Sequence, residues 1–117
     1  MTILIAENNP LMRKMIRSLV EDLATEIVEC ADGEAAISLY EKHQPAWVLM
    51  DVSMSPIDGL SATRTIMSRF RSARVVIVTE HNDPETRRSA FEAGASEFFG
   101  KDYLLPLRTL LKQCGNR

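Results

Sequence analysis

Three short stretches of the chain are almost purely apolar, and polar residues flank each of them. They cover residues 3–6, 47–50 and 75–78, are rich in β-branched side chains and show no alternation. Such runs are typical of parallel strands that helices cover on both faces. Residues 26–30 alternate in part, as an edge strand does, and residues 97–100 are a shorter candidate. The pattern therefore predicts five strands.

Between these stretches, apolar residues recur at the three- and four-residue spacing of amphipathic helices. The first helix is expected after Asn9, which offers an N-cap, with Pro10 at the first helical position. Further helices are expected after Asp32, from Gly59, after Asp83, and around the last leucines of the chain. The stripe expected to be buried in the first helix comprises Leu11, Met12, Met15, Ile16, Leu19, Val20 and Leu23.

Strand and helix thus alternate five times within 117 residues. This alternation predicts an α/β fold with a parallel sheet, right-handed crossovers and helices on both faces. The length suits one core, so residues 1–117 are expected to form one domain. Apolar residues make up 45% and charged residues 26%, which is ordinary for a globular protein and excludes disorder.

Charge and hydropathy remove several classes of function. The 14 basic and 16 acidic residues give a net charge of −2, which is not typical of a nucleic-acid-binding surface. The longest apolar run, residues 46–50, is too short to span a membrane, and little room for a signal peptide precedes residue 3. Cys30 and Cys114 lack metal-ligand spacing. We expect a cytoplasmic protein with reduced thiols.

Polar residues stand where the predicted strands end. Glu7 and Asn8 follow the first strand, Asp51 the third, Thr79 the fourth and Lys101 the fifth. Ligands of open parallel sheets bind beyond the carboxyl ends of the strands, so we expect these side chains to share one crevice. Oxygen donors without soft ligands suit Mg²⁺, which takes only one or two carboxylates. A carboxylate beside Mg²⁺ and a lysine is equipped to form an acyl phosphate.

Three segments resemble one known family. The segment Val48-Leu49-Met50-Asp51-Val52-Ser53-Met54, with Asp58-Gly59-Leu60 after it, resembles the phosphoacceptor segment of receiver domains in bacterial two-component response regulators. Residues 75–79 resemble the strand that ends in that family's switch Ser or Thr, and residues 94–101 resemble the segment that ends in its lysine. Lys101 followed by Asp102, rather than by proline, resembles the branch usually fused to a LuxR-type helix-turn-helix domain.

The resemblance implies a flavodoxin-like (βα)5 fold with a doubly wound five-stranded sheet in the order 2-1-3-4-5. It also implies that Asp51 accepts a phosphoryl group from a sensor histidine kinase or a phosphotransfer protein. Glu7, Asn8, Asp51 and the main-chain carbonyl of Ser53 would hold Mg²⁺. The chain would then be a phosphorelay switch that assists its own phosphorylation and dephosphorylation, not a turnover enzyme.

The same resemblance assigns the switch. Thr79 would bond to the phosphoryl group, Lys101 would pair with it, and Phe98 would be the aromatic residue that reorients on activation. The helix at residues 83–93 is short and weakly apolar, so we expect it to form the output surface with the fifth strand and the last helix. That surface would control a partner or an output such as transcription, or would form a homodimer. Direct nucleic-acid binding and membrane binding are not expected.

Asn8 and Glu80 depart from the family pattern at the predicted site. Asn8 stands where the family usually has Asp, which removes a negative charge and predicts weaker Mg²⁺ binding. Glu80 stands where a small residue is usual, and it either narrows access and repels an anionic phosphodonor or points into solvent. His81 is a candidate for a weak influence on dephosphorylation.

These departures keep one alternative open, an atypical receiver that acts as a phosphorylation-independent protein-interaction module. A flavodoxin-like redox carrier would need a hydroxyl- and glycine-rich loop after the first strand, and residues 7–10 offer none. A nucleotide-binding enzyme is disfavoured as well, because neither G-x-G-x-x-G nor a Walker loop occurs.

Overall fold

Five parallel strands form one sheet in the order β2-β1-β3-β4-β5. The computed structural model describes residues 1–115 of the chain. The strand order and the parallel pairing confirm the doubly wound α/β fold expected from the sequence. The strands are β1 (Thr2–Ala6), β2 (Glu26–Cys30), β3 (Trp47–Met50), β4 (Val75–Thr79) and β5 (Glu97–Gly100).

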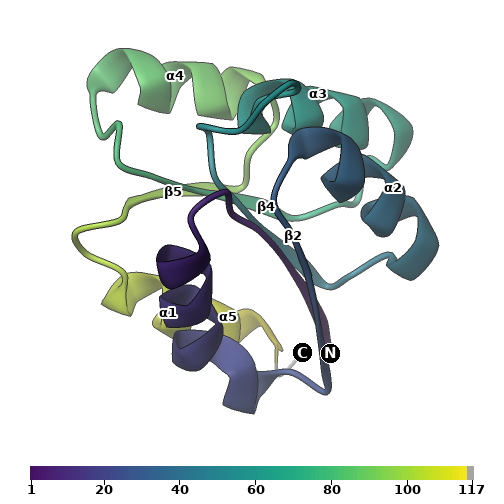
Figure 1. Ribbon diagram of the computed structural model, residues 1–117, viewed down its shortest axis with the longest axis vertical. Helices are drawn as coiled ribbons and strands as arrows, with labels where there is room; N and C mark the ends of the chain where they lie inside the picture. Colours follow the sequence, from purple (N-terminus) through teal and green to yellow (C-terminus); the bar gives the residue numbers. More distant parts are fainter. Residues whose placement is uncertain (116–117) are drawn as a thin grey trace.

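Helices cover both faces of the sheet, with α1 and α5 on one side and α2, α3 and α4 on the other (Figure 1). No helix among residues 1–115 combines the length and the apolar character needed to cross a bilayer. The helices are α1 (Pro10–Val20), α2 (Gly33–His43), α3 (Gly59–Arg69), α4 (Pro84–Glu92) and α5 (Leu105–Gly115), and a short 3-10 helix, η1 (Glu21–Leu23), follows α1.

A polar side chain caps the first turn of each of the first four α-helices. The carboxylate or amide oxygen accepts a hydrogen bond from a free main-chain N–H of that turn, which stabilises the helix start by about 1 kcal/mol. The caps expected at Asn9, Asp32 and Asp83 are confirmed. Asp58 caps α3 in the same way, with Oδ1 2.8 Å from the N–H of Ser61.

The sheet separates two apolar cores. Side chains of the buried central strands alternate, so that Val48 and Met50 pack under α2, α3 and α4, whereas Trp47 and Leu49 pack under α1 and α5. The neighbouring residues Phe98 and Phe99 divide in the same manner between the two cores. They therefore flank opposite faces of this short strand.

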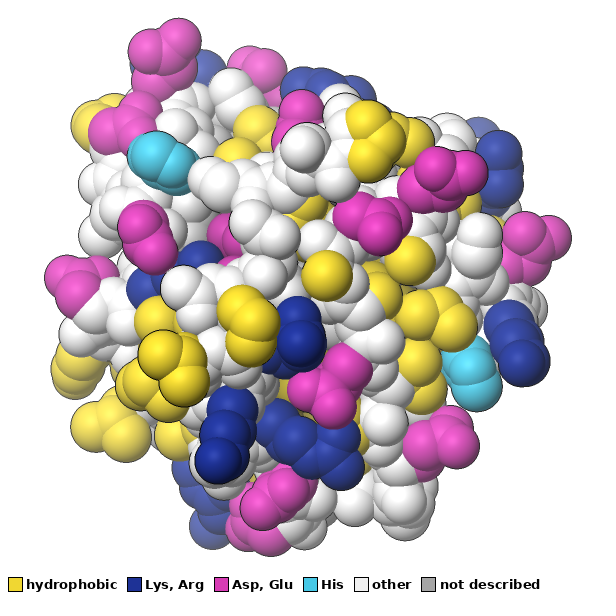
Figure 2. All heavy atoms as spheres, in the orientation of Figure 1, with side chains coloured by type: hydrophobic (Ala, Val, Ile, Leu, Met, Phe, Trp, Pro, Cys, Tyr) yellow, Lys and Arg dark blue, Asp and Glu magenta, His cyan; other side chains and the backbone are white. Residues whose placement is uncertain are grey.

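The stripe predicted for the first helix is only partly buried. Ile16 and Val20 are buried, but Leu11 is 77% and Met15 is 59% exposed. The predicted stripe is wide enough to hold two rows of side chains. Because the helix lies on a sheet, it buries only the row that faces the sheet, and the other row stays exposed. Figure 2 shows hydrophobic side chains gathered over α1 and the start of α5, at the lower left.

Candidate functional site

A cavity of about 160 Å³ opens at the carboxyl ends of the strands. This volume is several times the space that one water molecule needs. Of the five side chains expected to share a crevice, the structure brings four to the cavity and leaves Thr79 outside its lining. The residues that line it are Glu7, Asn8, Asn9, Asp51, Ser53, Glu80 and Lys101.

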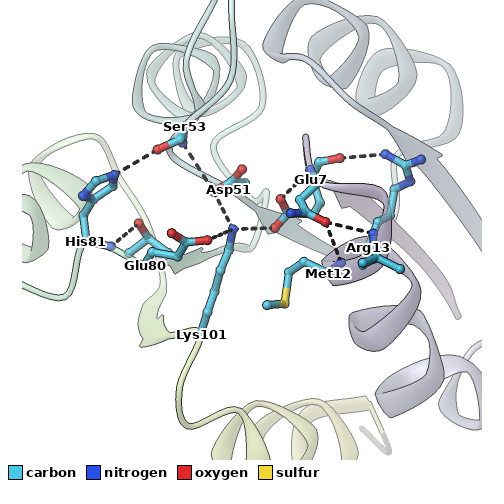
Figure 3. A network of polar contacts seen from close by, with 11 residues as sticks. Glu7, Met12, Arg13, Asp51, Ser53, Glu80, His81 and Lys101 are labelled. Atoms are coloured by element: carbon cyan, nitrogen blue, oxygen red, sulfur yellow. Dashed lines mark hydrogen bonds and ion pairs between the residues drawn. The ribbon is translucent and has the colours of Figure 1, made fainter.

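Lys101 lies at the centre of this group (Figure 3). Its ammonium nitrogen Nζ is 2.9 Å from Oε1 of Glu7 and 3.2 Å from Oδ1 of Asp51. Glu80 is more distant, with Oε1 4.0 Å from the same nitrogen. The main-chain N–H of Lys101 donates to the carbonyl of Thr79 over 2.8 Å, which fixes the end of β5 beside the end of β4. The ammonium group therefore joins carboxylates that come from three different strand ends.

Asp51 follows β3, and its side chain is 3% exposed. Its Oδ1 forms the ion pair with Lys101 and accepts a hydrogen bond from the main-chain N–H of Ser53 over 3.3 Å. Within residues 1–115, no hydrogen bond or ion pair engages Oδ2. This leaves Oδ2 as the carboxylate oxygen that is free to act as a nucleophile.

The loop after Asp51 is held tightly against the start of α3. The N–H of Gly59 donates to the carbonyl of Val52 over 3.0 Å. A Cβ atom at Gly59 would overlap the main-chain carbonyl oxygen of Asp51. Only glycine fits at this first helical position, so the packing of α3 determines where Asp51 stands.

Glu7 is buried at the inner end of the cavity. Its Oε2 accepts from the N–H of Asn9 over 3.0 Å, and its Oε1 faces Lys101 without an aligned hydrogen bond. Burial raises the pKa of the Glu7 carboxyl, against the opposing effects of Asn9 and Lys101. Burial alone would lower the pKa of Lys101, but its contacts with Glu7 and Asp51 prevail and raise it. The lysine is therefore charged at neutral pH.

A second set of contacts joins the loops after β3 and β4. The hydroxyl oxygen of Thr79, which is fully buried, accepts from the N–H of His81 over 3.0 Å. The ring nitrogen Nε2 of His81 is 3.1 Å from Oγ of Ser53 (Figure 3). No sequence pattern indicates this contact, because it joins exposed residues 28 positions apart.

The donors at the cavity are oxygen atoms. Residues 1–115 contain no group of three or more His, Cys, Asp and Glu side chains around one possible metal position. The cavity instead offers the carboxylates of Glu7 and Asp51, the exposed Asn8, and Ser53. Mg²⁺ accepts such a set, since it takes one or two carboxylates and keeps several waters. The buried Oε1 of Glu7, which lacks an aligned hydrogen bond, also fits a bound cation.

Phe98 lies on β5, away from the cavity, and is only 3% exposed. It packs into the core under α2, α3 and α4. The guanidinium carbon of Arg87, on α4, lies 5.6 Å from the centre of its ring and 5.3 Å from that of Phe91. In this structure Phe98 therefore occupies an inward position, with Arg87 over its ring.

Comparison with known proteins identifies the family of this chain. Residues 3–112 match the model of the response regulator receiver domain. The chain belongs to this family. It is thus a receiver domain of two-component phosphorelay signalling, and receiver domains bind Mg²⁺ and work with histidine kinases. Such domains are typically phosphoacceptor switches rather than enzymes.

Two relatives are similar over most of this chain. The transcriptional regulatory protein DegU of Brevibacillus brevis is 28% identical over 102 residues, which cover 86% of this chain and 43% of DegU. This receiver domain therefore spans less than half the length of that relative. A LuxR-family two-component response regulator from Aurantimonas is 30% identical, with a TM-score of 0.87 over 99% of this chain and 86% of that one. The expected likeness to the LuxR branch is confirmed.

A solved complex of CheX and CheY with BeF3 and Mg from Borrelia burgdorferi shares the fold. Its matching chain is 22% identical, with a TM-score of 0.86 over 97% of this chain and 88% of that one. This likeness confirms the flavodoxin-like receiver fold.

Proposed function

We propose that this receiver domain, over residues 1–117, is a switch that accepts a phosphoryl group on Asp51 from a sensor histidine kinase or a phosphotransfer protein. One observation carries the proposal: the ammonium of Lys101 joins Asp51 and Glu7 at a cavity with room for a phosphoryl group. Phosphoryl transfer requires mainly positioning and neutralisation of charge, and this arrangement supplies both.

In the proposed reaction, Oδ2 of Asp51 attacks the phosphorus atom and the donor's leaving group departs with the bonding electron pair. Lys101 then neutralises part of the charge on the phosphoryl oxygens. Glu7, Asn8, Asp51 and the main-chain carbonyl of Ser53 would hold Mg²⁺, which supplies further positive charge when bound. The hydroxyl group of Thr79 would donate a hydrogen bond to a phosphoryl oxygen.

The exposed row of α1 supports a docking role for this end of the molecule. Leu11 and Met15 lie in the helix that begins directly after Asn8 and Asn9, which line the cavity. Exposed apolar side chains next to a polar site are typical of protein contact surfaces. We propose that the phosphodonor protein covers them while it delivers the phosphoryl group.

The output belongs to the same proposal. Phe98 would change position with Thr79 and alter the surface formed by α4, β5 and α5. The packing of α4 supports this assignment, because Ala90 is its one buried residue and Arg87 contacts the ring of Phe98. This surface would contact an output domain or partner, such as a transcription regulator, or form a homodimer. We propose that the protein acts in the cytoplasm and that this domain does not itself bind nucleic acid.

The test of phosphorylation is a mass measurement. Purified protein is incubated with acetyl phosphate and Mg²⁺, and the intact mass is recorded for the wild type, Asp51→Ala and Asp51→Asn. We expect one added phosphoryl group on the wild type and none on either variant. A wild-type mass that stays unchanged under these conditions contradicts the proposal.

We also propose that Asn8 weakens Mg²⁺ binding, because it brings an amide where a carboxylate would add charge. Titration calorimetry with Mg²⁺ should give a higher affinity for Asn8→Asp than for the wild type. Equal affinities would show that the Asn8 position has no part in cation binding.

The second candidate is a protein-interaction module that needs no phosphorylation. It is favoured by the engagement of Lys101 with three carboxylates, and by the Thr79 hydroxyl, which accepts from His81 outside the cavity lining. If the mass assay shows no adduct while Asp51→Asn still binds its partner with wild-type affinity, this alternative is correct.

A further inference from the structure

Glu80 is the outermost carboxylate of the cavity. The side chains of Glu7 and Asp51 are 1% and 3% exposed, whereas that of Glu80 is 71% exposed and still lines the cavity. A molecule that enters from solvent therefore meets the charge of Glu80 before it reaches Asp51.

Within residues 1–115, the ion pair with Lys101 neutralises the charge of Glu80 only in part. Lys101 lies closer to Glu7 and to Asp51 than to Glu80, which is 4.0 Å away. Three carboxylates thus share one ammonium group, which leaves an excess of two negative charges around the cavity. The field of Glu80 acts on whatever approaches.

The main chain around Glu80 is held in place. Its carbonyl accepts from the N–H of Asn82 over 3.1 Å. The next residue, His81, is bonded through its N–H to Thr79 and through its ring to Ser53. Figure 3 shows the Glu80 carboxylate directed toward Lys101, between that residue and His81. The main chain at Glu80 is thus held in place at the rim, with the carboxylate carried beside the cavity.

We infer that Glu80 is a specificity-determining residue that selects phosphodonors by charge and disfavours dianions. This inference rests on the proposed phosphorylation of Asp51. A donor that carries positive charge beside its phosphoryl group, as a protein surface is able to do, would be disfavoured less.

Two small donors differ in net charge and deliver the same group. Acetyl phosphate is a dianion at neutral pH: Asp51 forms a bond to phosphorus, the bond from phosphorus to the acetyl oxygen breaks, and acetate leaves with the electron pair. Phosphoramidate is a monoanion whose nitrogen carries three protons: the bond from phosphorus to nitrogen breaks and ammonia leaves with the electron pair. Both reactions yield the same acyl phosphate on Asp51.

Coulomb's law sets the size of the effect. At a separation of about 7 Å in a water-like dielectric, one pair of unit charges changes a rate by about threefold. Loss of the Glu80 charge should therefore speed reaction with the monoanion about threefold and with the dianion about sevenfold. A substitution that changes the reactivity of Asp51 toward both donors equally would leave the ratio of the two rate constants unchanged.

The experiment compares the wild type, Glu80→Gln, Glu80→Ala and the control Glu85→Gln, which removes an exposed carboxylate of α4 outside the cavity. Phosphorylation rate constants are measured by intact mass with both donors at saturating Mg²⁺. We expect Glu80→Gln to raise the ratio of acetyl phosphate to phosphoramidate rates about threefold and Glu85→Gln to leave it unchanged. An unchanged ratio in Glu80→Gln, with faster reaction only in Glu80→Ala, would show steric obstruction and overturn the inference.

Salt gives an independent reading, because it screens the charge of an exposed side chain. The wild-type rate with acetyl phosphate should rise with ionic strength more steeply than that of Glu80→Gln, and equal slopes count against the inference.

The adduct on Asp51 separates this inference from the proposed function. An adduct with unchanged ratios overturns the charge selection alone, and the lack of any adduct on the wild type and on Glu80→Gln overturns both.

Discussion

The ammonium nitrogen of Lys101 lies 3.2 Å from Oδ1 of Asp51, and both side chains are almost fully buried. Two buried carboxylates, Asp51 and Glu7, depend on this one cation for neutralisation. The arrangement supports phosphoryl transfer, and it also makes the folded state sensitive to loss of the lysine.

Lys101→Met should therefore lower the free energy of unfolding by about 3 kcal/mol, because it leaves two buried carboxylates without a counter-charge. Its rate of phosphoryl uptake should fall by about a hundredfold. Urea denaturation and the mass assay measure the two effects, with the exposed Lys112→Met as control. Addition of Mg²⁺ should restore part of the stability, and an equal response of both variants to Mg²⁺ would contradict this interpretation.

The contact between His81 and Ser53 should be measurable as a coupling energy. A double-mutant cycle of His81→Ala, Ser53→Ala and the double variant isolates the hydrogen bond from other effects of each change. We expect a coupling of about 0.5 kcal/mol in the free energy of unfolding, since the bond is exposed to solvent. Strict additivity of the two single changes would mean that the contact contributes nothing in solution.

Gly59→Ala should disturb the site through the main chain. Its new Cβ would overlap the carbonyl oxygen of Asp51, so α3 or the loop must move at a cost of about 2 kcal/mol. We expect slower phosphoryl uptake as well, because Asp51 is displaced. Ser68→Ala, at an exposed position of the same helix, should change stability by less than about 0.5 kcal/mol. Equal stability of Gly59→Ala and the wild type would show that the loop adapts freely.

Cys30 gives a pH dependence with a definite sign. Burial raises the pKa of its thiol to about 11, so the thiolate forms only at high pH. In a Cys114→Ser background, alkylation by iodoacetamide at pH 8 should be about a hundredfold slower than for a free thiol and should rise with pH toward about 11. The thiol of the unfolded chain loses its proton at a lower pH than the folded one. The contribution of Cys30 to the free energy of unfolding therefore declines as the pH rises from the ordinary thiol pKa to about 11. A rate that levels off near pH 9 would contradict the assigned pKa.

Much of the site was predictable because it depends on strand ends. Apolar runs located the strands, and Asp51 and Lys101 stand directly after two of them, so a parallel sheet had to bring them to one edge. The helix caps were predictable for a similar reason, since an N-cap acts within three residues of its own position.

The remaining features depend on distances that local patterns do not encode. Leu11 and Met15 fit the helical period, yet they are exposed because α1 buries only the row nearer the sheet. The bond between His81 and Ser53 requires two loops to meet, and the period of either strand says nothing about that. Thr79 was expected inside the crevice, and only the structure shows its hydroxyl oxygen accepting from His81.

The exposure of α1 leads to a contrast in stability. Leu11→Ala should change the free energy of unfolding by less than about 0.5 kcal/mol, because the side chain is largely in water already. Ile16→Ala, five residues further along the helix, should cost about 3 kcal/mol through loss of buried area and a new cavity. Thermal and urea unfolding of both variants measure the contrast, and similar losses would mean that Leu11 is covered in solution.

Within residues 1–115, the hydroxyl group of Thr79 donates no hydrogen bond. Among the contacts of residues 1–115, its oxygen accepts from His81 and its hydrogen is given to no acceptor. A hydroxyl group is able to accept and donate at the same time. Donation to a new oxygen within reach would therefore not compete with the hydrogen bond that this hydroxyl accepts from His81.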